Sequence, residues 1–248
     1  MARKFVADGV VVLACTPHIL PGLYPNTGPA IIEAMRQLQG VLDAEGIPLL
    51  LVSGADNHMV PDFVDGLRSG RLLSLNGSRY VLVEPPHHSV PPRMEDFFFD
   101  ILAHGYVPIL THPERLSWIN QNYGIVERLT DGGVWMQITA GSLIGAFGRT
   151  ARYWSERMLD EGRVHILATD AHDVVRRPPN LSLAHEVAVK RVGMGEAENL
   201  VFGRPRGIIS NVSPSELQLP ERRIAPTRNE TRTGAAFAFT RGVRRFFE

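Results

Sequence analysis

Five short motifs along this chain each follow an apolar run, and together they contain six histidine and carboxylate side chains. The motifs read "TPH", "GAD", "LVE", "THP" and "TDAH" in chain order. Three members are equally spaced and the next follows at about twice that interval, which indicates a repeated structural unit. Imidazole nitrogens and carboxylate oxygens are donors that divalent metals take in proteins, so the set predicts a metal cluster. Its members are His18, Asp56, Glu84, His112, Asp170 and His172.

Each of these residues alone is a weak signal, because a polar residue after a strand more often caps a loop than binds a metal. The common spacing and the Asp170-x-His172 pair favour the joint interpretation. Three further histidines, His58, His87 and His88, lie near the same motifs without a spacing argument. The sequence leaves their roles open.

Two arginines follow the predicted ligands closely. Arg115 ends "THPER", and Arg177 lies in "DVVRRPP" after the last ligand pair. A planar guanidinium beside a metal is suited to binding a phosphate through paired hydrogen bonds. Both arginines are therefore predicted to hold a phosphate group, whereas Arg176 is interpreted as a surface charge.

The elements that must position these side chains are apolar runs at 10–15, 48–53, 80–84, 107–111, 134–139 and 164–169. Their lack of alternation is typical of parallel strands buried on both faces. Helical patterns lie between them, at 29–44, 93–104, 121–131 and 148–161. This alternation predicts an α/β fold with a parallel sheet or barrel, whose C-terminal mouth would gather the metal ligands.

The composition excludes several classes of protein. Lysine plus arginine equals aspartate plus glutamate, 26 each, so no global field attracts nucleic acid or an anionic membrane. The apolar run "GVVVLAC" is too short to span a bilayer and lacks the layout of a secretion signal, so a cytoplasmic protein is expected. We predict one barrel domain over 1–212 and a basic, disordered tail over 213–248.

Several motifs, in order, resemble the polymerase-and-histidinol-phosphatase (PHP) superfamily: "TPH", "GAD", "LNGSRYVLVEPP", "GYVPILTHPER", "QITAGSLIGAFGR" and "ATDAHD". Within it, residues 3 to 210 are similar to the bacterial CpsB/CapC-type capsular polysaccharide tyrosine phosphatases. The resemblance implies a distorted (β/α)7 TIM-like barrel with two or three divalent metal ions, manganese first and iron or zinc as alternatives. It also implies hydrolysis of phosphotyrosine by metal-activated water, with the tail of a bacterial tyrosine autokinase as substrate, in the regulation of capsular or exopolysaccharide synthesis.

The resemblance also implies residue roles by matching positions. Asp56 stands where the family usually has a glutamate, which is one methylene longer. A rival tyrosine-phosphatase chemistry uses a cysteine with an arginine six residues on, but the only cysteine, Cys15, has Pro21 at that place. A cysteine mechanism is therefore excluded. The implied metal ligands are His18, Glu84, His112, Asp170 and His172, and the implied phosphate-holding residues are Arg115 and Arg177.

One departure from the family concerns the first strand. Such barrels open with a strand that ends His-x-His, and this sequence contains no His-x-His. The segment "KFVADGVVVLACTPH" fits the second strand better, and "MARKFVADG" looks like the second half of an amphipathic helix that ends at Gly9. We therefore expect a barrel that lacks its first strand, with the missing histidine pair upstream of Met1.

Two other functions remain alternatives at this point. A degenerate barrel would bind a phosphorylated kinase tail without hydrolysing it. A PHP phosphatase of another kind would act on a small phosphate ester such as histidinol phosphate. The sequence does not indicate an oligomeric state.

Overall fold

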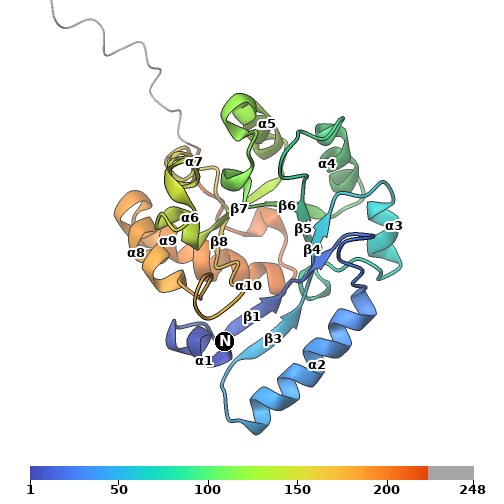
Figure 1. Ribbon diagram of the computed structural model, residues 1–248. Helices are drawn as coiled ribbons and strands as arrows, with labels where there is room; N and C mark the ends of the chain where they lie inside the picture. The colour runs from blue at the N-terminus through green and yellow to red at the C-terminus, as the bar shows by residue number, and fades with distance from the viewer. Residues whose placement is uncertain (223–248) are drawn as a thin grey trace, which may run out of the picture.

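The computed structural model describes residues 1–222, whose paired strands are parallel. One sheet has the order β2-β4-β5-β6-β7-β8, and β1 pairs with β3. In Figure 1 the strands lie toward the middle and the helices surround them. The strands are β1 (Val12–Cys15), β2 (His18–Ile19), β3 (Leu50–Ser53), β4 (Asp56–His58), β5 (Tyr80–Glu84), β6 (Val107–Thr111), β7 (Trp135–Thr139) and β8 (Ile166–Ala168).

The helices alternate with these strands, which confirms the predicted mixed α/β class with a parallel sheet. No helix of the described part is both long and apolar enough to cross a membrane. The α-helices are α1 (Ala2–Ala7), α2 (Gly28–Ala44), α3 (Phe63–Arg68), α4 (Met94–Ala103), α5 (Ile119–Asp131), α6 (Ala140–Leu143), α7 (Gly148–Asp160), α8 (Leu181–Val192), α9 (Met194–Glu198) and α10 (Arg204–Ile209). Tighter turns span Leu75–Gly77, Pro113–Arg115 and Pro214–Glu216, and a π-helical turn spans Asn199–Gly203.

The first two predicted strands, 10–15 and 48–53, each continue as a second short strand after a break. His18 pairs with Asp56 beyond the break, so the β1–β3 pair leads into the β2–β4 pair. At Gly54 the chain packs so closely that a Cβ atom would lie 2.9 and 3.0 Å from neighbouring side chains. His18 and Asp56 do follow the predicted strands, but each begins a further short strand, β2 or β4, where the sequence had indicated a loop.

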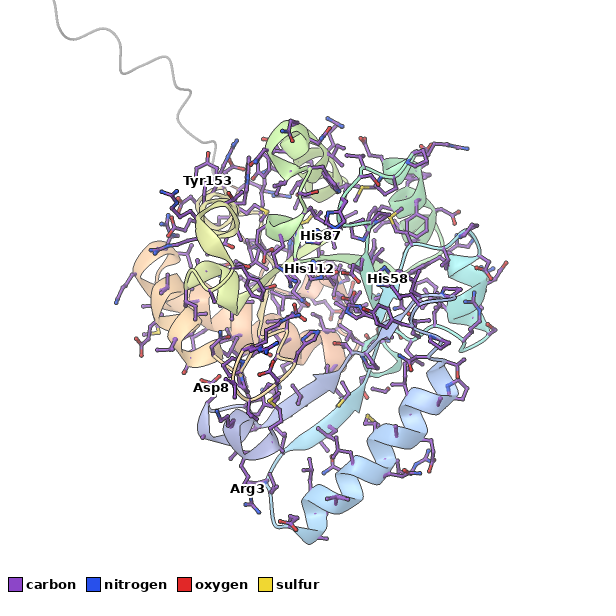
Figure 2. The ribbon with its side chains drawn as sticks, in the orientation of Figure 1. Arg3, Asp8, His58, His87, His112 and Tyr153 are labelled. Atoms are coloured by element: carbon purple, nitrogen blue, oxygen red, sulfur yellow. The ribbon has the colours of Figure 1, made fainter. Side chains whose placement is uncertain are left out.

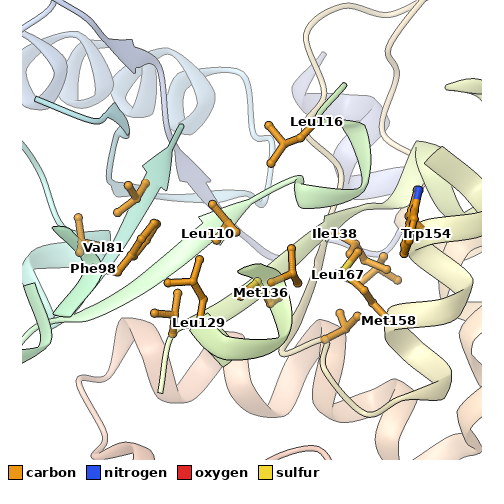
Figure 3. Packing of buried hydrophobic residues seen from close by; sticks show 14 of the residues in the cluster. Val81, Phe98, Leu110, Leu116, Leu129, Met136, Ile138, Trp154, Met158 and Leu167 are labelled. Atoms are coloured by element: carbon orange, nitrogen blue, oxygen red, sulfur yellow. The ribbon is translucent and has the colours of Figure 1, made fainter. Parts of the chain in front are cut away.

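The central strands are buried on both faces, which explains their continuously apolar sequences. Along β5, Val81 and Val83 belong to one hydrophobic cluster with Phe98 of α4. The alternate residues Tyr80 and Leu82 belong to a second cluster on the other face. Figure 3 shows Val81 and Phe98 close together in the first cluster. The sheet therefore has a packed face on each side, and the rigid strand ends are free to carry polar groups.

Strands β1 and β8 face each other across a cavity. Among residues 1–222, β1 pairs with β3 and β8 with β7, and the two strands do not pair with each other. The cavity has a volume of about 490 Å³, and its lining combines apolar residues such as Val12 and Ile166 with the polar residues His18 and Asp170. The mouth of the sheet is therefore continuous with an apolar interior.

Helix α1 is tied to the loop that precedes α8. Asp8, directly after α1, accepts hydrogen bonds from the Leu181 backbone N–H at 2.6 Å and the Ser182 hydroxyl at 2.5 Å. Lys4 Nζ donates to the Val174 carbonyl at 2.6 Å. Asp8 thus satisfies N–H groups at the start of α8 as a capping side chain does. The loop between β8 and α8 is held in place from a distant part of the chain.

The first residues of the predicted tail contact the body of the protein. Ser213 and Glu216 form a capping box around a short 3₁₀ turn. The Gln218 carbonyl accepts a hydrogen bond of 2.7 Å from Arg204 Nε, and Arg222 Nη1 donates to the Gly162 carbonyl at 3.5 Å. The rest of the predicted tail, 223–248, lies outside the described residues.

A buried histidine lies at the start of β8, away from the predicted metal ligands. His165 is 5% exposed, and its ring stacks on Trp135 with centroids 4.9 Å apart. Its Nδ1 accepts a hydrogen bond of 3.1 Å from the Met136 N–H. Burial, helped by the nearby charge of Arg204, lowers the pKa of His165 to about 3. The ring is therefore neutral in the folded protein under ordinary conditions.

This histidine predicts a loss of stability in mild acid. Because its pKa is about 3 when folded and about 6.5 when unfolded, only the unfolded chain takes up its proton between these values. The contribution of His165 to the free energy of unfolding is therefore fully present above about pH 6.5. Below that pH the free energy of unfolding decreases by up to about 1.4 kcal/mol per pH unit. Urea unfolding from pH 7.5 to 4.5 should show a shallower decline for His165→Asn than for the unchanged protein.

The matched control is His104→Asn, since His104 follows α4 at the surface and its side chain is 35% exposed. This variant should retain the full pH dependence. Equal slopes for His165→Asn and the unchanged protein would contradict the prediction.

Candidate metal centre

One group of metal-type donors comes from three adjacent strands. The parallel register pairs His58 of β4 with Glu84 of β5, and His18 lies on the neighbouring β2. His18 Nδ1 lies 3.0 Å and His58 Nε2 2.7 Å from Glu84 Oε2. Rigid strand ends thus bring two imidazoles and one carboxylate oxygen to a single point, within reach of one ion.

A second group shares the same glutamate. His112 Nε2, after β6, lies 3.3 Å from Glu84 Oε1 and 3.8 Å from Asp56 Oδ2. Donor atoms of these three residues lie within 4.8 Å of one another. Oε2 of Glu84 faces the first group and Oε1 the second, so the two groups share this carboxylate. Asp56 lies within 3.7 Å of His18 Nδ1 as well, so it stands between the groups.

The donor atoms of the first group fit a metal ion. His18 Nδ1, His58 Nε2 and Glu84 Oε2 are buried, yet none has a hydrogen-bond partner of acceptable geometry. Buried polar atoms without partners are costly, so natural proteins seldom retain them without a ligand. A set of imidazole nitrogens and carboxylate oxygens suits manganese, iron or zinc. The residues present therefore fit a divalent transition metal.

The electrostatics of the site favour a cation. Burial opposes ionisation of Glu84, but the close approach of His112, His18 and His58 outweighs it and holds the pKa of Glu84 well below its usual range. Burial raises the pKa of Asp56 to about 6, against the opposing charge of His112. Contact with Glu84 raises the pKa of His18. An ionised Glu84 thus lies in a desolvated place, where a bound cation would offset its charge.

Two arginines lie at the same mouth and share one partner. Arg115 Nη1 and Arg177 Nη2 both donate to Asp170 Oδ2. Arg177 Nη2 also donates to the Asp170 carbonyl at 3.0 Å. Arg177 Nε is buried and has no hydrogen-bond partner. The two guanidinium groups therefore converge on one anionic oxygen, and the Arg177 Nε donor is left unpaired within the described residues.

The turn that carries Arg115 is fixed by a buried carboxylate. Glu114 Oε1 accepts hydrogen bonds from the Thr139 N–H at 3.0 Å and the Ser142 hydroxyl at 2.7 Å. His112, at the start of the turn, has a φ of 36°, in the left-handed region that non-glycine residues rarely adopt. Such backbone strain occurs where a site dictates the side-chain direction. The turn is therefore held so that His112 and Arg115 face the mouth together.

Asp170 and His172 reach the mouth but not either ligand group. The Asp170 carboxylate is engaged by the arginines, and the backbone there has a φ of 48°. His172 Nδ1 contacts the Asp170 carbonyl at 2.9 Å, and its ring centroid lies 6.4 Å from that of His18. Of the six predicted ligands, the structure thus brings four together, and Asp170 and His172 lie beside them. The four are His18, Asp56, Glu84 and His112.

His58 is a donor whose role the sequence left open. It lies two residues after Asp56 on the same strand, and alternate strand residues point to the same face. The "DNH" spacing was therefore a usable signal. Burial and the charge of His112 lower the pKa of His87, but neither His87 nor His88 belongs to the two donor groups. Figure 2 labels His58, His87 and His112, which lie toward the middle of the molecule in that view.

Fold and site together define a mixed α/β protein in which parallel strands bring together histidine and carboxylate side chains, of the kind that bind metals, and a pair of arginines. The chain belongs to the CpsB/CapC family of capsular polysaccharide synthesis, whose model matches residues 1–210. The resemblance stated from the motifs is thereby confirmed.

Individual relatives agree with this assignment. The chain is 36% identical over 193 residues to the tyrosine-protein phosphatase YwqE of Bacillus subtilis, covering 78% of this chain and 76% of that one. It is 28% identical over 211 residues to the tyrosine-protein phosphatase CpsB of Streptococcus pneumoniae, covering 82% and 85%. A solved structure from work on YwqE and CpsB, described as unique metal-dependent tyrosine phosphatases, superposes with a TM-score of 0.84 at 33% identity and covers 91% of this chain and 90% of that chain.

Proposed function

We propose that this chain is a metal-dependent protein-tyrosine phosphatase that acts in the regulation of capsular or exopolysaccharide synthesis. The observation that carries the proposal is the position of Glu84, whose two oxygens face two groups of metal-type donors. Arg115 and Arg177 converge at the same mouth. Metal ions and arginines around a phosphate stabilise the charge that develops during hydrolysis of a phosphate monoester. Curated relatives named tyrosine-protein phosphatase support this substrate class.

The proposed roles divide the mouth into two parts. His18, His58, Asp56, Glu84 and His112 would hold the metal ions, and Asp170 and His172 would join them from the neighbouring loop. When bound, the ions supply an activated water and neutralise phosphate charge. Arg115 and Arg177 bind the non-bridging phosphate oxygens, and Arg177 Nε is a donor without a competing partner.

The reaction needs no covalent enzyme intermediate. The oxygen of water adds to phosphorus in line while the bond to the phenolic oxygen breaks. One proton of the water stays with the inorganic phosphate that forms, and the other ends on the phenolic oxygen that leaves. Arg115 and Arg177 stabilise the equatorial oxygens, where charge is spread in the transition state. The chain's contribution is therefore positioning and charge.

The finer assignments rest on the family resemblance and the donor chemistry. We infer two or three divalent ions, manganese first, since nitrogen and oxygen donors suit it and the donor groups share Glu84. The inferred protein substrate is the phosphorylated tail of a bacterial tyrosine autokinase, and the inferred compartment is the cytoplasm.

The test compares substrates on protein loaded with Mn²⁺. A phosphotyrosine peptide should be hydrolysed, a chelator should abolish turnover, and His112→Ala should do the same. Histidinol phosphate and a phosphoserine peptide serve as comparison substrates, and bound metal is measured by elemental analysis.

Two outcomes would replace the proposal by its alternatives. Preferred turnover of histidinol phosphate would identify an enzyme for small phosphate esters. Binding of the phosphotyrosine peptide without turnover in metal-loaded protein would identify a non-catalytic binding module.

A further inference from the structure

An aromatic ring lies against both arginines of the mouth. Phe147 lies between α6 and α7, and its ring centroid is 4.4 Å from Arg115 Cζ and 5.5 Å from Arg177 Cζ. Both distances are within the range of an attractive cation–π contact, about 6 Å. The two arginines come from distant segments, the turn after β6 and the loop after β8. Phe147 is therefore a contact that they share besides Asp170.

The pair of arginines poses an electrostatic problem. Both guanidinium groups donate to the same oxygen, Asp170 Oδ2, so two positive charges lie close together. Their side chains are 17% and 27% exposed, so water screens their repulsion only in part. If Asp170 also held a metal ion, as proposed above, its charge would no longer offset both. Something else must then keep the arginines side by side.

We propose, on the basis of the proposed function, that Phe147 is a positioning residue that holds Arg115 and Arg177 together as a two-arginine phosphate clamp. The electron-rich face of an aromatic ring attracts a guanidinium group without carrying a charge of its own. It therefore reduces the tendency of the arginines to separate while leaving their N–H groups free for phosphate oxygens. Phe147 does not touch the phosphate and acts through the arginines.

The local chain is built to place this ring. A Cβ atom at Gly141 would lie 2.8 Å from Phe147 Cε2, so the ring packs where only glycine leaves room. Gly145 and Gly148, with φ of 90° and 87°, form the turn on either side of Phe147. The Ala146 N–H donates to the Gly141 carbonyl at 2.8 Å. The "GSLIGAFG" segment thus has a physical role that the metal ligands alone do not explain.

The test measures phosphate binding as well as turnover. In Mn²⁺-loaded protein, Phe147→Leu should weaken binding of inorganic phosphate about 10-fold by calorimetry, because two cation–π contacts are lost. The KM for p-nitrophenyl phosphate should rise by a similar factor with a smaller change in kcat. Phe147→Tyr, which keeps the ring, should stay close to the unchanged protein. The matched control is Phe99→Leu, on the exposed face of α4.

A double-mutant comparison of Phe147 with Arg115 distinguishes a positioning role of Phe147 from a general packing role. In an Arg115→Lys background, the effect of Phe147→Leu should shrink, since the planar guanidinium is gone. Three outcomes would each overturn the positioning role of Phe147 and leave the proposed function standing. They are unchanged phosphate affinity in Phe147→Leu, full additivity of Phe147→Leu with Arg115→Lys, and equal losses of affinity in Phe147→Leu and Phe147→Tyr. Failure of the unchanged protein to bind phosphate would overturn the proposed function together with it.

Discussion

Glu84→Gln is expected to abolish phosphatase turnover and to remove most of the bound metal. Glu84 presents one oxygen to His18 and His58 and the other to His112. Glutamine keeps the shape but loses the charge and one acceptor oxygen, so both donor groups are weakened at once. We expect kcat to fall by about 10³-fold or more, since metal ions supply several kcal/mol of transition-state stabilisation. Steady-state kinetics and elemental analysis measure the two effects.

The matched control is Glu95→Gln on α4. Glu95 pairs with Arg128 at the surface, at 2.7 Å, and takes no part in the mouth. It should retain metal and turnover. Full metal content together with normal turnover in Glu84→Gln would refute the shared role of this carboxylate.

The second large effect is expected at Arg115. Arg115→Ala should lower kcat/KM by about 10² to 10³-fold, the usual cost of removing a donor aimed at developing charge. Because Arg115 contacts the phosphate in the proposed site, the loss should be similar for p-nitrophenyl phosphate and for a phosphotyrosine peptide. Metal content should remain normal, since Arg115 is not a ligand, and this separates the variant from Glu84→Gln.

Arg128→Ala is the corresponding control, because Arg128 is an exposed arginine on α5 whose side-chain partner is Glu95. It should leave kcat/KM within about twofold. A loss in Arg115→Ala that is confined to the peptide substrate would show that Arg115 reads the peptide and not the phosphate.

Some elements could be predicted closely because burial alone dictates their residues. The run at 80–84 coincides with β5, and the run at 107–111 with β6. Both strands are buried on two faces, so every position must be apolar or paired and the pattern ends where the strand does. The predicted helix at 29–44 likewise begins one residue late relative to α2. Where burial restricts every residue of a strand, the sequence shows where that strand begins and ends.

Other features depend on contacts between distant segments, which a local pattern does not record. The short strands β2 and β4 contain histidine, aspartate and asparagine, which have little strand preference, and pair because β1 and β3 align them. The place of His58 beside Glu84 follows from that pairing. The engagement of Asp170 by Arg115 and Arg177 depends on the relative positions of two loops. The sequence indicated which residues meet at the mouth, but not which of them bond to one another.

The bond between Asp8 and the start of α8 also has a consequence during synthesis on the ribosome. The two partners are 173 positions apart. At roughly 5–20 residues per second, the ribosome needs about 9 to 35 s after Asp8 to make Leu181. During that interval Asp8 has no helix start to cap, because α8 and most of the loop before it have not yet been made. The loop that carries Arg177 is therefore fixed in its place at the mouth only after both Asp8 and Leu181 have been made.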